Sequence, residues 1–235
     1  MKIPENWQEV TIEDYLEAVN YSRSIEDNDR MRVEVINALS GGVVVSVRTT
    51  AVKDLIEAWR KVAFIRSRPK DYKQSVNDRR FVGFENITLN ELIVLENLFE
   101  KGFIDYMPEI IALLYRKEGQ GYANMSLSRE AEEVGELVAG DVIGVIDGWM
   151  DYAERLKKAK PKTFESPVPK EELNEWSEED LAEEEARVSR LKAYGWELLL
   201  LECVKGNMSC VPDLLKMNHI QVLNMVEAKR ANNIE

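Results

Sequence analysis

Apolar residues recur at intervals of three and four along most of the chain, and two of these runs follow a threonine that can cap a helix. Thr11 has an acidic residue in the expected first turn, Asp14, and Thr88 with Glu91 has the spacing of a capping box. An apolar period near 3.6 residues indicates an amphipathic helix. These signals predict a mainly α-helical protein.

The same periodicity predicts further helices at about 29–39, 52–63, 105–115, 128–137 and 141–157. We expect Thr49 or Thr50 to cap the second of these. The β-branched run 43–47 before it fits a short strand or an extended connection equally well. Residues 70–87 differ from the helical segments, because aromatic and β-branched residues flank a turn-forming Asn77-Asp78 pair. We predict a small β-hairpin there.

A change in composition divides the chain. Residues 157–170 are rich in lysine and proline, which indicates a linker, and an acidic stretch follows. Beyond it, apolar periodicity returns up to the C-terminus. We therefore predict a helical N-terminal body at 1–156 with the hairpin near 70–87, a charged linker at 157–176, and a small C-terminal helical unit at 177–235.

The charges are unevenly distributed. The net charge is −12, which disfavours general binding to nucleic acid, yet residues 60–80 carry a local charge of +6. Residues 171–185 hold nine acids and no base. Contact of the basic strip with DNA phosphates is the less favoured alternative, and a chain with this dipolar pattern is expected to bind complementary proteins or copies of itself. No apolar run reaches the roughly 18 residues of a membrane span, and residues 1–10 do not resemble a signal peptide.

The residues expected to contact a partner are drawn from these charged segments and from two tryptophans. An exposed tryptophan among like charges is typical of an interface anchor. The predicted partner-binding residues are Trp7, Trp176, Glu178, Glu179, Asp180, Arg66, Arg68, Arg79 and Arg80.

Few residues suit catalysis. His219 is the single histidine, and its neighbours in sequence include the two cysteines, Cys203 and Cys210. These three side chains are one ligand short of a closed zinc site, and the spacing of the cysteines is not that of zinc ligands. The favoured interpretation places His219 on a helix surface and treats the cysteines as small buried side chains. Phosphate-binding glycine motifs are absent from the sequence, so we expect no enzyme activity and no cofactor.

Three segments resemble a family of phage proteins. The start, IPENWQEVTI at 3–12, is similar to the I-P-x-x-W-x-E-V-T-L opening of tail-assembly or tail-associated proteins encoded in the structural gene clusters of tailed bacteriophages. Residues 84–98 resemble their strand-like segment running into I-T-L-x-E-L-I-x-L. Residues 194–223, which begin Tyr-Gly-Trp and contain Asp213-Leu-Leu-Lys-Met, resemble their C-terminal module.

This resemblance implies a protein partner and no catalytic residues. The expected function is non-enzymatic phage morphogenesis through contacts with tail or neck components, in the host cytoplasm during assembly. A second alternative is a subunit of a portal–tail (neck) ring that stays in the virion, with homo-oligomers formed between the basic and acidic segments of neighbouring copies. The alternative from another class is a metal-dependent enzyme using Cys203, Cys210 and His219.

Overall fold

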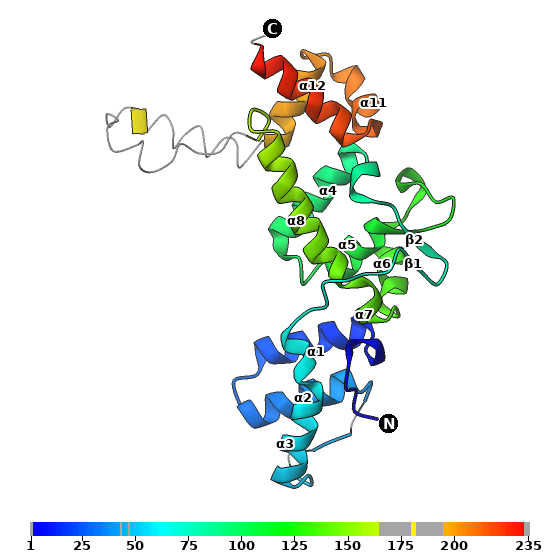
Figure 1. Ribbon diagram of the computed structural model, residues 1–235, viewed down its shortest axis with the longest axis vertical. Coiled ribbons are helices and arrows are strands. Elements are labelled where there is room, and N and C mark those ends of the chain that lie inside the picture. The colour runs from blue at the N-terminus through cyan, green and yellow to red at the C-terminus, as the bar shows by residue number, and fades with distance from the viewer. Residues whose placement is uncertain (1, 43, 47, 165–179, 182–194, 233–235) are drawn as a thin grey trace. The chain divides into compact units, whose positions relative to one another are not determined.

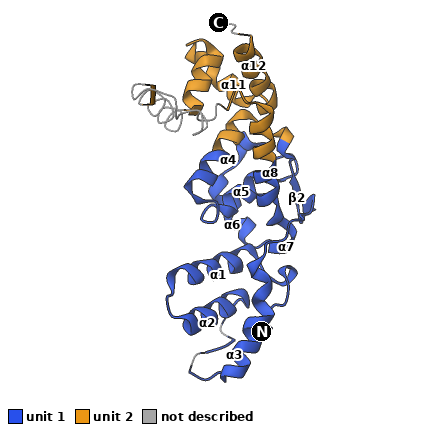
Figure 2. Cartoon of the chain, turned by 60° about the vertical axis from the view of Figure 1, so that its left-hand side comes forward, with its two compact units in different colours: residues 1–84, 95–151 blue, residues 85–94, 152–235 orange. Residues whose placement is uncertain are grey.

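The computed structural model describes residues 2–42, 44–46, 48–164, 180–181 and 195–232, and it divides the chain into two compact units. Unit 1 contains residues 1–84 and 95–151, and unit 2 contains residues 85–94 and 152–235 (Figure 2). The fold is mainly helical with a small antiparallel sheet, as the sequence predicts (Figure 1).

The elements follow one another along the chain as helices interrupted by short strands and 3-10 turns. The α-helices are α1 (Ile12–Ser24), α2 (Asn28–Leu39), α3 (Val52–Lys61), α4 (Leu89–Gly102), α5 (Met107–Leu114), α6 (Leu127–Gly135), α7 (Ala139–Val142), α8 (Gly144–Ala159), α11 (Val211–Lys216) and α12 (His219–Ala231). Residues 195–204 are also helical. The 3-10 helices are η1 (Trp7–Glu9), η2 (Val62–Arg66), η3 (Phe84–Asn86), η4 (Tyr122–Asn124) and η5 (Met208–Cys210).

The capping signals explain where two helices begin. The Thr11 side chain accepts from Asp14 N and the Asp14 carboxylate accepts from Thr11 N, which confirms the cap of α1 as a full capping box. Thr88 and Glu91 exchange the same pair of bonds at α4. Helix α3 is present, but the prediction that Thr49 or Thr50 caps it was wrong. Its N-cap is Ala51, which offers no side-chain bond, and Thr50 Oγ1 instead accepts from Ser46 N.

The core of unit 1 is built around α5. Its residues 107 and 110–114 have no exposed surface, so this helix is apolar on every side and is covered by its neighbours. Helix α6 packs against α5, and α1 packs against α2. Each fully buried leucine or isoleucine stabilises such a core by about 1.5–3 kcal/mol.

The predicted hairpin is present and has a third strand. Strands β1 (Ser75–Val76) and β2 (Arg79–Phe81) pair antiparallel around Asn77, whose φ of 53° suits an asparagine turn. Strand β3 (Tyr115–Lys117) pairs with the other edge of β2, giving the order β1-β2-β3. The predicted helix over 105–115 therefore ends at Leu114, where the chain becomes extended. Residues 44–46 form no strand.

Unit 2 joins segments that are distant in sequence. Leu89 N donates to Met217 O, which brings the start of α4 to the turn before α12. Arg230 of α12 pairs with Glu202 at 2.5 Å and also donates to the carbonyl of Lys162. The predicted linker thus begins with residues fixed against α12, and its residues 165–176 lie outside the described ranges. The units also differ from the predicted boundaries in assigning 85–94 to the C-terminal part.

Candidate functional site

Among the helices whose bounds the structure describes, α3 has the most strongly amphipathic pattern. Its apolar residues Val52, Leu55, Ile56 and Trp59 recur at intervals of three, one and three, which places them along one face of the helix. In a packed helix, this face would be buried. Ala58 is the one residue of α3 that is buried, so the apolar face is not covered as the pattern leads one to expect.

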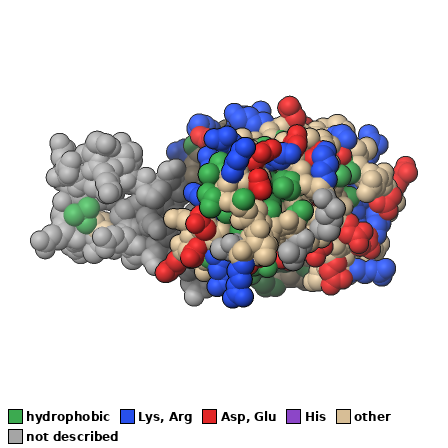
Figure 3. All heavy atoms as spheres, turned by 90° about the horizontal axis from the view of Figure 1, so that it is seen from below, with side chains coloured by type: hydrophobic (Ala, Val, Ile, Leu, Met, Phe, Trp, Pro, Cys, Tyr) green, Lys and Arg blue, Asp and Glu red, His purple; other side chains and the backbone are tan. Residues whose placement is uncertain are grey.

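The exposed part of this face is a row along the helix. The exposed fraction is 74% for Val52 and 44% for Ile56, and Arg60 lies four residues further along on the same side. Figure 3, which views the molecule from the end where α3 lies in Figure 1, shows hydrophobic side chains gathered on the surface with charged side chains around them. We call Val52, Ile56 and Arg60 the α3 row.

Arginines flank the aromatic part of the same face. The Arg32 guanidinium lies 5.9 Å and that of Arg66 6.0 Å from the centroid of the Trp59 ring. Arginine above an indole face makes a favourable cation–π interaction and buries apolar surface while its charge stays hydrated. Trp59 is therefore held half-buried beneath two cations, beside the α3 row.

Cations outnumber acids around the α3 row: Lys53, Arg60, Lys61, Arg32 and Arg66 lie on or beside α3, and the exposed acids of the helix itself are Asp54 and Glu57. Lys61 pairs with Glu5 at 3.0 Å, and Arg32 pairs with Asp29 at 3.4 Å, but these exposed pairs are weak. Within the described parts of the chain, neither Arg60 nor Arg66 forms an ion pair, and both are exposed. An apolar row with guanidinium groups beside it that are in no ion pair suits an acidic, amphipathic protein surface.

Half of the eight cations in the predicted basic strip are in ion pairs inside unit 1. Arg68 pairs with Asp147 at 2.6 Å and lies over the Phe103 ring, and Lys73 pairs with Asp141 at 2.7 Å. These pairs join the segment before the sheet to α7 and α8. The strip is consequently not a continuous cationic surface, and Arg66 and Arg80 are the exposed members of the predicted arginine set.

Arg79 belongs to a buried charge network. Its side chain is 2% exposed and binds Glu130 at 2.6 Å and Glu133 at 2.8 Å, while Lys117 also pairs with Glu133. Burial raises the pKa of Glu130, but bonds from Gln120 and Arg79 and nearby positive charges hold this pKa below its usual value. The network fastens the sheet to α6. The prediction that Arg79 binds a partner therefore needs correction, because no partner can reach its guanidinium.

The predicted tryptophans and acids lie in different environments. Trp7 is half-buried, with its ring centroid 5.2 Å from that of Tyr15 and 5.4 Å from that of Phe64, and its indole N–H donates to Ser67 O. These contacts hold the N-terminal segment against α1 and the segment around η2. Asp180 is exposed. Trp176, Glu178 and Glu179 lie outside the described residues.

The histidine–cysteine set does not form a site. His219 is fully buried, which corrects its expected place on a helix surface. Its Nδ1 lies 2.8 Å from Ile87 O and its Nε2 lies 2.7 Å from the Tyr152 hydroxyl, so both ring nitrogens have hydrogen-bond partners. Since a carbonyl can only accept, Nδ1 carries the proton and Nε2 accepts from Tyr152.

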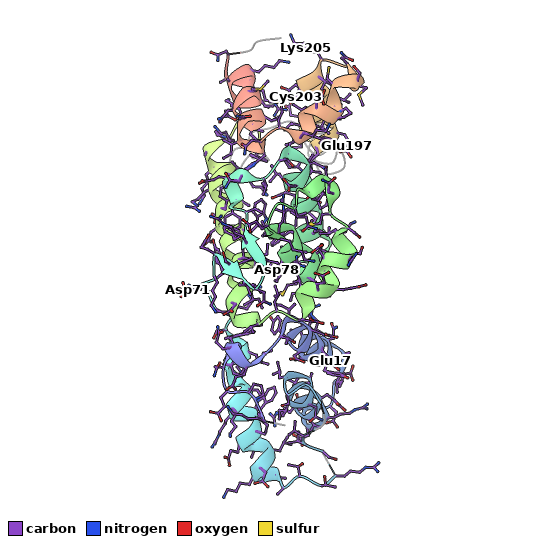
Figure 4. The ribbon with its side chains drawn as sticks, turned by 90° about the vertical axis from the view of Figure 1, so that its right-hand side faces the viewer. Glu17, Asp71, Asp78, Glu197, Cys203 and Lys205 are labelled. Atoms are coloured by element: carbon purple, nitrogen blue, oxygen red, sulfur yellow. The ribbon has the colours of Figure 1, made fainter. Side chains whose placement is uncertain are left out.

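The cysteines also differ from expectation. Cys210 is exposed, and Cys203, labelled in Figure 4, is half-buried on the helical segment 195–204. Burial, followed by the charge of Glu202, raises the pKa of the Cys203 thiol, which makes it a poor nucleophile at neutral pH. In the described part of the chain, no three histidine, cysteine or acidic side chains are grouped so that they could hold a metal ion.

The sequence did not predict the residues of the α3 row as a binding surface. The amphipathic pattern of α3 was visible, but a pattern reports which face is apolar and not whether another element covers that face.

None of the helices that the structure describes is long and apolar enough to cross a membrane. Comparisons of the chain with protein-family models, curated proteins and solved structures found no match.

Proposed function

We propose that this protein is a non-enzymatic assembly protein that acts by binding other proteins through α3. The observation that carries this proposal is the exposed row of Val52 and Ile56 beside unpaired arginine side chains. Apolar side chains four residues apart on one helix are the usual anchors of helix-mediated binding. Leaving them in water has no stabilising effect on the free chain, whereas their burial against a partner is favourable.

The biological setting rests on the sequence resemblance. Residues 3–12, 84–98 and 194–223 resemble segments of tail-assembly or tail-associated proteins of tailed bacteriophages, so we place the function in phage morphogenesis. The partners are then tail or neck components, met in the host cytoplasm during assembly. The alternative within this setting is a stoichiometric ring subunit of the portal–tail region, which the dipolar charge favours.

The enzyme alternative has less support. A metal ligand needs a free lone pair, and the two ring nitrogens of His219 are engaged with Ile87 and Tyr152. In the described residues, neither His219 nor either of the two cysteines is grouped with two further ligands as a metal site requires. Metal analysis of protein purified without chelator checks this alternative directly. A stoichiometric metal ion would favour the enzyme.

Mass spectrometry of purified virions and of infected-cell complexes tests the proposal. A fixed ratio to the portal protein, near the subunit number of a symmetric ring, identifies a virion subunit. Absence from virions, combined with a stoichiometric complex with a tail or neck protein in infected cells, identifies a transient chaperone. Absence from virions and from every complex with a structural protein of the phage would contradict the proposed function.

A further inference from the structure

A groove on unit 1 combines apolar and acidic side chains. It is formed by α1, α6 and the start of α5, and its volume is about 470 Å³. The residues that line it are Glu13, Leu16, Glu17, Asn20, Pro108, Ala131, Glu132 and Gly135.

The groove combines an apolar surface with a negative rim. Leu16, Pro108 and Ala131 supply the apolar part, and Glu17, labelled in Figure 4, and Glu132 supply exposed carboxylates. In the described residues, Glu132 forms no ion pair, and Glu17 accepts a bond from the Tyr21 hydroxyl and is paired with no cation. An occupant of this groove therefore needs apolar side chains with a cation close to them.

We propose that the groove of one copy of this protein binds the α3 row of a second copy. The row presents Val52 and Ile56 for the apolar part of the groove, and Arg60 for its carboxylates. Lys53, next to Val52, adds a second exposed cation. A helix with anchors at i and i+4 that enters an apolar groove is an established mode of recognition.

The two surfaces share no residue, so the contact is heterologous. The α3 row spans residues 52–60, and the groove is lined by residues of α1, α5 and α6. Each copy offers one row and one groove, and a repeated head-to-tail contact of this kind closes into a ring or continues as a filament. This inference rests on the proposed function and deepens it, because it names a further copy of the chain as a partner.

The complementarity of charge provides a matched test. In the groove variant, Glu17→Lys with Glu132→Lys makes the rim positive, and in the row variant, Lys53→Glu with Arg60→Glu makes the row negative. All four side chains are exposed, so neither change disturbs the core. Each variant alone then brings like charges together, whereas a mixture of the two pairs every positive groove with a negative row, and every negative groove with a positive row.

Light scattering coupled to gel filtration, at low and high salt, gives the readout. We expect wild-type protein to self-associate at low salt and to dissociate as salt screens the charges. Each variant alone should associate about tenfold more weakly or not at all, and the equimolar mixture should restore wild-type association. The mixture also controls for folding, because misfolded variants would not restore binding.

Three results would overturn the inference. They are a monomeric wild type at low salt, unchanged association of either variant alone, and a mixture of two variants that unfold like wild type but fail to associate. If self-association instead disappears when the glutamates of residues 171–185 are changed to glutamine, the occupant of the basic surface is that acidic segment and not the groove. A monomeric protein that still binds a phage structural protein through α3 would refute the inference while leaving the proposed function standing.

Discussion

His219 illustrates how burial changes the role of a residue at the smallest scale. Its ring lies inside unit 2 with no exposed surface, between the Ile87 carbonyl and the Tyr152 hydroxyl. Burial raises the pKa of Tyr152 to about 12, so this hydroxyl stays protonated and donates to His219. His219, the histidine that a histidine-dependent active site would need, is therefore a neutral side chain in the core.

The titration of His219 gives the first prediction. Burial lowers its pKa below 6.5, although the bond to Ile87 O and the charges of Glu91 and Glu85 act in the opposite direction. When pH falls below about 6.5, the unfolded chain binds a proton before the folded chain does. The contribution of neutral His219 to stability is therefore complete above pH 6.5 and is lost as pH falls from there through the lower pKa of the folded protein.

NMR can measure this titration without ambiguity, because the chain has a single histidine. We expect the imidazole of the folded protein to titrate below pH 6.5. The free energy of unfolding should become smaller as pH falls through that range. A His219→Gln variant should lack this pH dependence. An imidazole pKa at or above 6.5 would show that the ring is accessible to water, contrary to the structure.

Gly144 gives a second prediction at the scale of one residue. A Cβ atom added at this position would overlap the carbonyl oxygen of Asp71 and would lie 2.8 Å from that of Lys70. Because both atoms belong to the backbone, Gly144→Ala should destabilise the protein by about 1–3 kcal/mol. Gly121→Ala is the matched control, since its Cβ would meet no atom within 4 Å. Equal stability of the two variants, measured by urea unfolding, would contradict the close approach.

Local signals in the sequence predicted what depends on a few neighbouring residues. The caps at Thr11 and Thr88 follow from side chains three positions apart, and the hairpin follows from the Asn77-Asp78 turn. The burial of His219 depends instead on Ile87 and Tyr152, which lie 132 and 67 residues away in sequence. Such distant contacts leave no mark in a local pattern.

At the scale of elements, the sheet shows why one strand was missed. Tyr115–Lys117 follows directly on the apolar helix α5, and its side chains continue a pattern that suits a helix. Pairing with β2 and the bonds of Lys117 within the charge network favour the extended form. Tertiary contacts thus override a local helical preference.

The charge network gives a prediction for β2. Arg79→Ala leaves the buried Glu130 without its closest cation, so the free energy of unfolding should fall by about 3–5 kcal/mol. Arg80→Ala on the same strand removes an exposed cation and should change it by about 0.5 kcal/mol or less. Similar losses in thermal or chemical unfolding would show that Arg79 is not buried as described.

Helix α3 is the element on which the functional account depends. Its amphipathic pattern was recognised in the sequence, and so was the basic character of the residues that follow it. The exposed apolar row could not be recognised, because a sequence pattern does not show that Val52 and Ile56 stay in water while Ala58 of the same helix is buried. Partner surfaces are therefore harder to predict than caps.

At the scale of the whole molecule, the net charge of −12 and the basic surroundings of the α3 row act together. An acidic chain with a locally basic, apolar surface repels its copies except where that surface meets a carboxylate-rimmed groove. The charge distribution predicted from sequence is dipolar. In the structure, Arg68, Lys73 and Arg79 are paired inside unit 1, which leaves the cations around α3, together with Lys70 and Arg80, as the exposed positive part of the strip.

The most direct test of this account is affinity purification of the wild-type chain and two single variants from infected cells. Ile56→Asp places a charge in the α3 row, and Met150→Asp places one on α8, where the methionine is 47% exposed, close to the 44% of Ile56. We predict a stoichiometric protein partner, either a phage structural protein or a second copy, that binds wild type and Met150→Asp but is lost with Ile56→Asp. A partner retained by Ile56→Asp, or the absence of any stoichiometric partner from wild type, would contradict the assignment of α3 as the binding surface.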